Sequence, residues 1–235
     1  MKRFSYLENV GLSLAGILCK EDLSIFESEK TLFSVDNIIE HKLCEIGIKY
    51  TSVCRVKQEH TDIVVVLDSS LEFDKEVLSH TVADGIITNL PGIVLVISVA
   101  DCVPIFLFDS RKKVLGLIHA GREGTRKKVV VNALKEFFTR FNSSPDDIFA
   151  LIGPSIGPCC YQVSDEIAIQ CLIDGLYISQ GNKVDLWFSN LTQIKKQGIP
   201  HHNIFLTSEC TCCSNSYYSY RGGDKIARNY AVGMI

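Results

Sequence analysis

Cys102 and His119 are the two residues whose types and positions most suggest chemistry. Cys102 closes an apolar run that begins at Gly92, and His119 lies near the end of a later apolar run. A thiol beside an imidazole supplies either two ligands of a metal site or a Cys-His catalytic pair. The structural alternative is a buried cysteine beside a hydrogen-bonded core histidine. Sequence spacing alone leaves these possibilities open.

The strands that carry these two residues must form a hairpin. β-Branched and aromatic residues predict strands over 104–108 and 114–118, joined by a tight polar turn. If Asp109 pairs with Lys112, Cys102 lies directly opposite His119, with Cβ atoms about 4.5–5.5 Å apart. A slip of one residue would put the two side chains on opposite faces of the sheet.

His60 is a third candidate for the same site. It precedes the apolar run 63–67, so we expect it at the edge of a strand. Together with Cys102 and His119 it would complete a catalytic zinc arrangement, in which three protein ligands leave one position open. His80, in a predicted loop, is the rival ligand. The other histidines have no such context and are predicted to lie at the surface: His41, His201 and His202.

Ten cysteines are many for a chain without a recognisable signal peptide, so we expect free thiols rather than disulfides. Cys210-Thr-Cys212-Cys213, with Cys159-Cys160 upstream, suggests a structural zinc site. The sequence offers no second pair with the CxxC spacing of chelating cysteines. We therefore interpret most of the cysteines as small buried apolar side chains.

Composition and charge restrict the class of protein. The 235 residues are 46% hydrophobic and 22% charged, as in an ordinary globular protein. A net charge of −3 without a basic stripe argues against nucleic-acid binding. The apolar segment 92–108 is too short for a membrane span and contains Asp101. The sequence therefore predicts a cytoplasmic protein that binds neither nucleic acid nor membranes.

The predicted elements give an α+β fold without repeats. Strands are expected at 52–56, 63–67, 85–88, 93–99, 104–108, 114–118, 149–152 and 204–207. Helices are expected at 37–50, from a cap at Thr125 to Phe141, from Ser164 onward, and at 185–197. No flexible linker divides the chain, so we predict a single domain over residues 1–235.

Five short motifs occur in an order that matches a known family. The match runs from about Arg55 to the C-terminus, and residues 1–50 diverge. The chain resembles the YfiH, or laccase-domain, family of purine nucleoside phosphorylases, whose members were once described as multicopper polyphenol oxidases. The motifs that carry the resemblance are Ala83-Asp84-Gly85-Ile-Ile-Thr88, Ala100-Asp101-Cys102-Val-Pro104, His119-Ala-Gly121, Gly153-Pro-Ser-Ile-Gly-Pro-Cys-Cys-Tyr161 and Ser219-Tyr220-Arg221.

The resemblance implies a fold, a metal and an activity. The fold is a layered α/β/β/α domain similar to the CNF-type cysteine-hydrolase toxins. The metal is a catalytic zinc ion held by His60, Cys102 and His119. The activity is cleavage of adenosine, inosine, guanosine and methylthioadenosine with phosphate, together with deamination of adenosine. The implied partners are therefore a small nucleoside and phosphate.

The resemblance also suggests roles for other residues, as a hypothesis of mechanism. Zinc would lower the pKa of a bound water or orient phosphate. Arg55, Arg122 and the backbone amides of 121–124 are candidate phosphate donors. Asp84 or Glu59 could shuttle the proton in deamination.

Four further residues have two possible roles each. Asp101 could orient a ligand or cap a strand end. Tyr161 and Tyr220 could stack on a purine, or pack as ordinary core aromatics. Arg221 could bind substrate in the pocket or form a salt bridge.

The sequence departs from the family pattern at the site itself. His-Ala-Gly-Trp-Arg-Gly of the family is His119-Ala-Gly-Arg122-Glu123-Gly124 here, so we ask whether Arg122 replaces the family arginine from a shifted position. Gln-Val-His-Gly is Gln58-Glu59-His60-Thr61. The N-terminal Arg-Gly-Gly and Ser-Leu-Asn-Leu segments of the family are absent from the sequence. These changes raise the possibility of altered substrate preference or weak activity.

Two other function classes remain as alternatives. A copper-dependent phenol oxidase needs a trinuclear cluster and a blue-copper site, which six histidines mostly without context do not supply. A metal-free Cys-His hydrolase, or a binding module that keeps the fold, would use the same residues without zinc. Metal analysis and adenosine turnover with and without phosphate distinguish the three.

Overall fold

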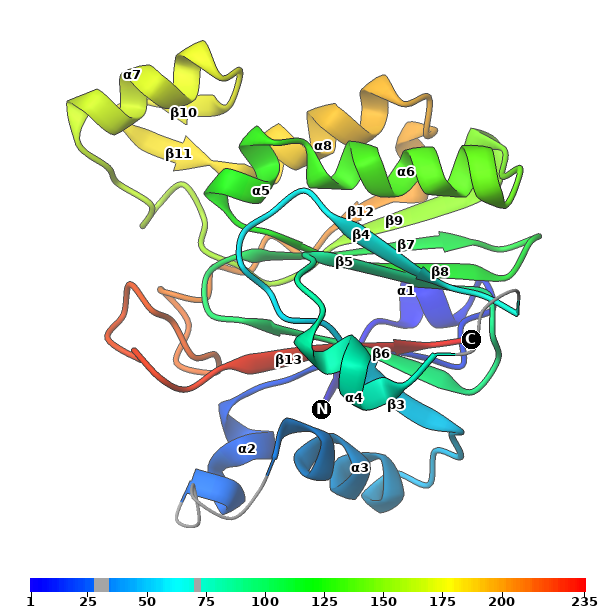
Figure 1. Cartoon of the computed structure of the whole chain (residues 1–235). Helices are drawn as coiled ribbons and strands as arrows, with labels where there is room; N and C mark the ends of the chain where they lie inside the picture. Colours follow the sequence, from blue (N-terminus) through cyan, green and yellow to red (C-terminus); the bar gives the residue numbers. More distant parts are fainter. Residues whose placement is uncertain (28–33, 70–72) are drawn as a thin grey trace.

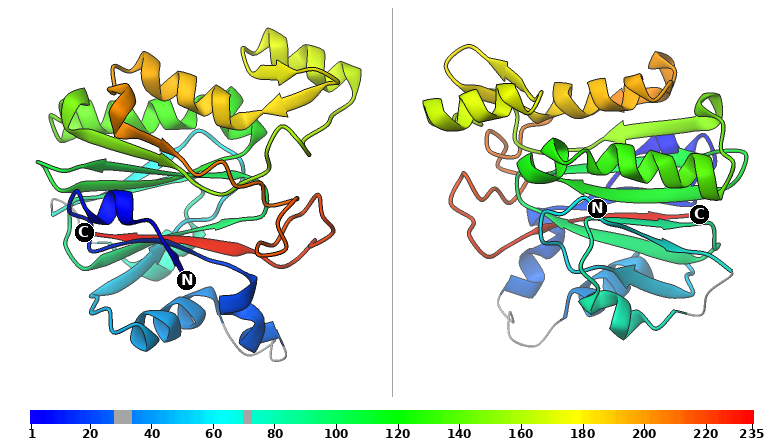
Figure 2. Two further views of the ribbon diagram at one scale, coloured as in Figure 1. Left: turned by 180° about the vertical axis from the view of Figure 1, so that it is seen from behind. Right: turned by 45° about the horizontal axis from the view of Figure 1, so that its top comes forward.

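The computed structural model describes residues 1–27, 34–69 and 73–235. Two β-sheets lie face to face, and helices cover the outer face of each (Figure 1). The views in Figure 2 show the same four layers from behind and from above. The expected α/β/β/α architecture is confirmed.

The six-stranded sheet contains the hairpin that carries Cys102 and His119. Its strand order is β12-β9-β7-β8-β5-β4, with β7 and β8 near its centre. The strands are β4 (Val64–Leu67), β5 (Gly85–Thr88), β7 (Val103–Asp109), β8 (Val114–Ala120), β9 (Ile148–Ile152) and β12 (Ile204–Leu206).

The five-stranded sheet joins the two ends of the chain. Its strand order is β1-β2-β13-β6-β3, so the last strand pairs with β2 on one side and β6 on the other. The strands are β1 (Lys2–Arg3), β2 (Leu14–Leu18), β3 (Ser52–Arg55), β6 (Ile93–Val99) and β13 (Asn229–Met234).

Helices cover both outer faces. On the six-stranded sheet these are α5, α6 and α8, with α7 and the hairpin β10–β11 at one corner; α2 and α3 cover the five-stranded sheet (Figure 1). Their bounds are α2 (Lys20–Glu27), α3 (Val35–Glu45), α5 (Arg122–Arg126), α6 (Val129–Arg140), α7 (Asp165–Ile173), α8 (Leu186–Lys196), β10 (Tyr177–Ser179) and β11 (Lys183–Asp185). The short helices are α1 (Ser5–Glu8), α4 (Lys75–His80), η1 (Pro145–Asp147) and η2 (His201–Asn203). Among the described residues, no helix combines the length and apolar character needed to cross a bilayer.

The central strands are buried on both faces, which explains their nearly continuous apolar sequence. All residues of β7 and β8 are buried, and Phe106 and Phe108 lie in the core between the two sheets. Ile105 and Leu107 point the other way, into the core beneath the helices. Burying each such side chain contributes about 1.5–3 kcal/mol, so the hairpin is a rigid base for the residues at its ends.

The register of this hairpin corrects the prediction. His119 pairs with Pro104, not with Cys102, which lies just before the first residue of β7. The observed register is shifted by two residues from the expected one. Because side chains alternate with a period of two, this shift keeps Cys102 and His119 on the same side of the hairpin.

The turn explains the shift. Asp109 pairs with Val114, so the turn contains four residues rather than two. The Asp109 carboxylate accepts hydrogen bonds from the backbone N–H groups of Arg111 (2.9 Å) and Lys112 (2.8 Å). Lys113 then adopts the left-handed conformation, with φ of 53°. The buried Asp109 carboxylate therefore stabilises the four-residue turn by accepting hydrogen bonds from backbone N–H groups within it.

The helix expected to run from a cap at Thr125 to Phe141 is two helices, which corrects that prediction. Thr125 lies within α5, and Lys128 in the left-handed conformation (φ 64°) separates α5 from α6. The helix expected at 37–50 is α3, which ends five residues earlier, at Glu45. The remaining two helices lie close to their expected positions. Ser164 caps α7 and Asp185 caps α8, each accepting a hydrogen bond from a backbone N–H group in the first turn.

Candidate active site and metal centre

A cavity of about 710 Å³ opens where several strands end. The parallel strands β3 and β6 bring their carboxyl ends to the same edge, so the segments 55–60 and 98–102 line this cavity together. His119 near the end of β8 and Arg122 in α5 also line it, as do Tyr161, Tyr220 and Arg221. The volume is within the usual range for small-molecule sites.

His60, Cys102 and His119 converge in this cavity, and we call them the triad. Their potential ligand atoms all lie within 4.8 Å of one another. The Cys102 Sγ atom is 3.7 Å from His60 Nε2, and the two imidazole rings lie 5.0 Å apart at 72°. His60 is exposed, Cys102 is half-buried and His119 is buried. Two imidazoles and one thiol at this spacing could hold a metal ion.

Asp84 contacts the segments that carry both histidines of the triad. It directly precedes β5, is fully buried, and its Oδ1 lies 2.7 Å from His119 Nδ1. This contact engages one ring nitrogen and leaves Nε2 for Cys102. The same carboxylate accepts hydrogen bonds from the backbone N–H groups of His60 (3.1 Å) and Thr61 (2.5 Å) and from the Thr61 hydroxyl (2.7 Å). One side chain therefore holds both histidine segments.

Two strained residues shape the loops that present the ligands. His60 has φ of 58° and Asp101 has φ of 82°, conformations that non-glycine residues seldom adopt. Gln58 fixes the first loop, because its amide exchanges two hydrogen bonds (2.9 and 2.8 Å) with the backbone of Ser98. Such strain persists only where surrounding contacts compensate it, and it concentrates at functional sites.

Asp101 holds the far wall of the cavity rather than a ligand of the triad. Its carboxylate accepts hydrogen bonds from the Thr211 hydroxyl and from the Arg221 backbone N–H, both at 2.7 Å. Its carbonyl oxygen accepts from the Ile156 N–H at 2.9 Å. Asp101 therefore ties two distant loops to the end of β6.

Arg122 and Arg221 lie on the side of the cavity near Tyr161. The Arg221 guanidinium is 5.4 Å from the Tyr161 ring centroid and donates to two carbonyl oxygens in the segment 160–162 at 3.3 and 2.8 Å. Burial raises the pKa of Tyr161, and the positive charges of both arginines oppose that shift. Arg122 lies 3.4 Å from Glu123, which partly offsets its charge.

Arg55 and Arg228 supply positive charge elsewhere in the cavity. Both arginines line it, and both oppose the burial that raises the pKa of Tyr230 in β13. Arg55 forms an ion pair with Asp36 at 2.8 Å. Arg228 donates to backbone carbonyl oxygens. Together with Arg122 and Arg221, these two residues bring four arginines to the cavity, a distribution that suits an anionic substrate.

The charges of the triad and Asp84 depend on one another. Burial by itself would raise the pKa of Cys102, but the charge of His119 and hydrogen bonds from both histidines lower it to about 6. Burial would lower the pKa of His119, but the Cys102 thiolate and Asp84 raise it to about 9. For Asp84, hydrogen bonds from His119 and Thr61 outweigh burial and lower the pKa to about 2. Without a metal ion, the pair is a thiolate and an imidazolium at neutral pH.

This charge state predicts how Cys102 reacts in chelator-treated protein. Alkylation requires the thiolate, so the rate should stay high from neutral pH down to about pH 6 and then fall about tenfold per pH unit. In His119→Gln the imidazolium is absent, so the midpoint should move upward. Mass spectrometry of the peptide that contains Cys102 measures the rate separately from the other thiols. An unchanged midpoint in His119→Gln would contradict the assigned ion pair.

A family model described as multi-copper polyphenol oxidoreductase laccase matches residues 29–235. The chain belongs to this family. The resemblance expected from the five motifs is therefore confirmed.

Individual members of the laccase family are similar to this chain over most of its length. A purine nucleoside phosphorylase of Clostridium acetobutylicum is 33% identical over 178 residues, which is 73% of this chain and 72% of that protein. An adenosine deaminase, RL5, of an unknown prokaryotic organism is 28% identical over 190 residues, 75% of this chain and 72% of that protein.

YlmD of Geobacillus stearothermophilus links the sequence comparison to a solved fold. This purine nucleoside phosphorylase is 33% identical over 153 residues, which is 59% of this chain and 54% of that protein. Its crystal structure superposes with a TM-score of 0.78 at 24% identity, over 94% of this chain and 91% of that chain. The fold of the laccase family therefore extends over nearly the whole chain.

Two departures from the family motifs have clear positions in the structure. Thr61 stands where the family commonly has glycine, and its hydroxyl adds a hydrogen bond to Asp84. Arg122 stands where the family commonly has tryptophan, and it lines the cavity. Glu123 forms an ion pair with Arg126 at 2.9 Å and lies at a second, smaller cavity. An arginine therefore reaches the main cavity from the shifted position.

Gly121 is required by the packing of the triad. A Cβ atom at this position would lie 2.8 Å from Cys102 Sγ and 2.9 Å from His60 Cδ2. We expect Gly121→Ala to push two potential ligands apart and to weaken metal binding by about tenfold or more. Gly124→Ala is the matched control, because its Cβ atom would meet nothing closer than 3.3 Å. Metal affinity from chelator competition checks the difference, and equal affinities would contradict it.

Several residues that line the cavity have no role assigned from sequence, among them Lys57, Ser98 and Arg228. Gln58 belonged to a recognised motif, but its contact with Ser98 crosses from one strand end to another, which spacing does not reveal. The rival ligand His80 is exposed and bonded to its own helix. The predicted surface positions of His41, His201 and His202 are confirmed.

The interpretation of most of the cysteines as buried apolar side chains is wrong, because eight of the ten are partly or fully exposed. All ten are free thiols, and Cys54 and Cys171 are buried as expected. However, four others converge with their sulfur atoms within 4.8 Å of one another, and none of the four is fully buried: Cys159, Cys160, Cys210 and Cys213. We call this group the cysteine tetrad.

Proposed function

We propose that this chain is a zinc-dependent purine nucleoside phosphorylase that also deaminates adenosine. The observation that carries the proposal is the triad, two imidazoles and a thiolate that converge in a cationic cavity of about 710 Å³. The names of the relatives support the reaction class. The proposed nucleosides are adenosine, inosine, guanosine and methylthioadenosine, and the second substrate is phosphate.

The donor set of the triad fits zinc. Zinc accepts imidazole nitrogen and thiolate sulfur, and a catalytic zinc site uses three protein ligands. A zinc ion held there would act as a Lewis acid and activate water for deamination. A multi-copper site would need more histidines. Among the residues that the structure describes, histidines converge as potential metal ligands in the triad, which contains two of them.

The residues of the chain divide the remaining work. We assign Arg122 and Arg221 to phosphate, because both guanidinium groups lie near Tyr161 in the cavity that also contains the triad. Holding phosphate there fixes the nucleophile and offsets its charge as an oxocarbenium-like state develops. Tyr161 and Tyr220 offer aromatic surface to the purine.

We assign positioning rather than proton transfer to Asp84. It is fully buried, and its two oxygens already accept hydrogen bonds from the His60 segment and contact His119. Glu59, the other candidate for the proton shuttle, is exposed and forms an ion pair with Lys57. Glu59 is also not among the residues that line the cavity, so we assign it no proton-transfer role.

Turnover of adenosine with and without phosphate tests the proposed reaction. The expected products with phosphate are adenine and ribose 1-phosphate, accompanied by a smaller amount of inosine and ammonia. Metal analysis of the same preparation should find zinc. Ammonia release that is independent of phosphate, without adenine, would make deamination the main activity and reject phosphorolysis. Copper with oxidation of phenols would reject both.

Arg122→Gln should raise the KM for phosphate by about tenfold or more, because charge-assisted hydrogen bonds contribute about 1.5–3 kcal/mol each. The expected change in KM for the nucleoside is small. Arg126→Gln is the matched control: Arg126 lies on the same short helix and pairs with the same Glu123, but it lines the smaller cavity. Steady-state kinetics with phosphate varied measure the effect, and equal KM values in the two variants would contradict the assignment.

The thiolate–imidazolium pair favours one second candidate, a metal-independent Cys-His hydrolase. In that case Cys102 would act as the nucleophile and His119 as its acid-base partner. Activity that survives complete removal of metal and is abolished by alkylation of Cys102 would support this candidate. Activity that requires zinc would reject it.

A further inference from the structure

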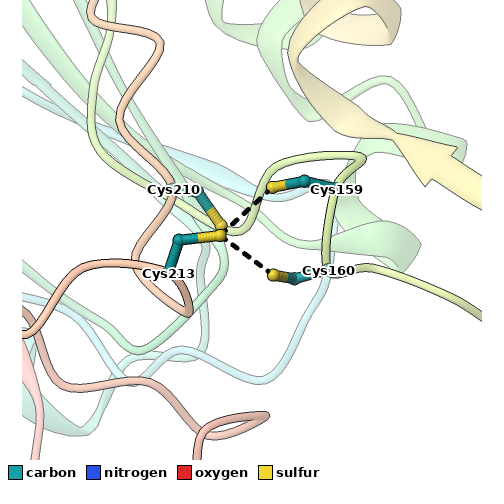
Figure 3. A group of neighbouring side chains, drawn as sticks. All are labelled: Cys159, Cys160, Cys210 and Cys213. Carbon is teal, nitrogen blue, oxygen red and sulfur yellow. Dashed lines mark hydrogen bonds between the residues drawn. The ribbon is translucent and has the colours of Figure 1, made fainter.

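The cysteine tetrad draws its members from two loops that are far apart in sequence. Cys159 and Cys160 lie in the loop after β9, and Cys210 and Cys213 lie in the loop after β12. In Figure 3 the side chains of the first pair point toward those of the second. The Cys213 sulfur atom lies 3.5 Å from that of Cys159 and 3.2 Å from that of Cys160. β9 and β12 are adjacent parallel strands, so their carboxyl ends deliver the two loops to one place.

These separations suit four ligands around one metal ion. Zinc–sulfur bonds of about 2.3 Å in a tetrahedron place the sulfur atoms about 3.8 Å apart. The observed separations are close to that value and below 4.8 Å for every pair. They are well above the sulfur–sulfur bond of about 2.05 Å in a disulfide. Cys210 and Cys213 also have the CxxC spacing of chelating pairs.

A backbone N–H group points at one sulfur atom of the tetrad. The Gly157 N–H donates to the Cys210 sulfur at 3.2 Å. Hydrogen bonds from backbone amides to sulfur are the outer contacts that stabilise metal-bound thiolates. The Arg221 guanidinium, bonded to the Cys160 carbonyl, adds positive charge beside the group.

We propose that the cysteine tetrad binds a zinc ion as a structural tetrathiolate site, separate from the triad. Each thiol that coordinates the ion loses its proton to solvent, so binding releases protons and tightens as pH rises. Thiolate ligands favour zinc over the hard cations magnesium and calcium. A closed site with four protein ligands leaves no position for substrate, so the role of this ion is structural.

The ion would join two loops that form one wall of the cavity. Ser155 and Thr211 already connect them through a backbone hydrogen bond at 3.0 Å. Tyr161 directly follows the first cysteine pair, and Arg221 bonds to the carbonyl of Cys160. Zinc at the tetrad would therefore position Tyr161 and Arg221 without touching the substrate.

Metal stoichiometry separates the tetrad from the triad. Protein purified under reducing conditions should contain about two zinc ions per chain, and Cys102→Ala and Cys213→Ser should each contain about one. The double variant should contain almost none. Cys212→Ser is the matched control, because Cys212 is adjacent to Cys213 but lies outside the tetrad. Cys44→Ser, at an exposed cysteine in α3, is the remote control. Both controls should retain about two ions.

Cobalt identifies the ligands without relying on a variant of the tetrad. Cobalt-substituted Cys102→Ala keeps the tetrad intact, so it should show the intense sulfur-to-cobalt charge-transfer absorption of a tetrathiolate site. Cys213→Ser should lose most of that absorption. This measurement decides the question even if Cys213→Ser does not fold.

Three results would overturn the proposal. The first is a single metal ion in the reduced wild-type protein that disappears in Cys102→Ala. The second is a disulfide between Cys213 and either Cys159 or Cys160 that persists in protein purified under reducing conditions. The third is an equal loss of metal in Cys212→Ser and Cys213→Ser.

Discussion

Cys102→Ala should lower kcat/KM for phosphorolysis of adenosine by roughly a hundredfold or more, mainly through kcat. The thiolate is the one anionic donor in the triad, and it lies within reach of both imidazoles. Its removal takes away a ligand and also the charge that keeps the pKa of His119 high. His119→Ala should have an effect of similar size, because it removes a second ligand and the imidazole that contacts Asp84.

The control for Cys102→Ala is Cys54→Ala, a small change in the core between the sheets. Cys54 is buried and its thiol contacts Ser52, so this variant should lose some stability but keep its metal and its activity. Metal content and steady-state kinetics are measured on the same preparations. Phosphorolysis that survives intact in both Cys102→Ala and His119→Ala would reject the proposed function.

Asp84→Asn should be the most disruptive substitution outside the triad. The amide has nearly the shape of the carboxylate, but it carries no charge and presents an NH₂ group to hydrogen-bond donors. The backbone N–H groups of His60 and Thr61 and the His119 ring would then compete for one oxygen. We expect a loss of about 3 kcal/mol in the free energy of unfolding, because buried donors lose their acceptor. Zinc affinity should fall by about 10–100-fold.

Asp101→Asn separates the effect on the metal from the general effect of losing a buried carboxylate. Asp101 is also buried, and its carboxylate accepts hydrogen bonds from Thr211 and Arg221 instead of the triad segments. This variant should lose stability and retain zinc affinity. Denaturant unfolding and chelator competition measure the two quantities. A zinc affinity in Asp84→Asn equal to that in Asp101→Asn would contradict the positioning role of Asp84.

The sequence predicts two members of the triad because apolar runs show where the strands end. Long apolar runs predicted β6, β7 and β8 closely, and the candidates Cys102 and His119 stood at their ends. The register was off by two residues because a single side chain, Asp109, selects the length of the turn. Because side chains alternate with a period of two, this error leaves Cys102 and His119 on the same side of the hairpin.

Other features depend on contacts that no local pattern encodes. β2 and β13 escaped prediction because glycine and alanine weaken their strand signal, and long-range pairing with β6 supplies what local propensity lacks. The helix break occurs at Lys128, where neither glycine nor proline marks it in the sequence. The cysteine tetrad joins segments about fifty residues apart. The sequence suggested a zinc site there, but the convergence of the four thiols depends on β9 and β12 lying side by side.

The place of β13 in the five-stranded sheet has a consequence for synthesis of the protein. Residues 64–206 provide every strand of the sheet that carries Cys102 and His119, so that sheet can assemble while the chain is still growing. The other sheet has β13 between β2 and β6, so it stays open until β13 has joined it. Tyr220, Arg221 and Arg228 lie in the segment just before β13. A growing chain can therefore bring the triad together before β13 has paired, yet it acquires a complete substrate cavity only when the segment before β13 is in place.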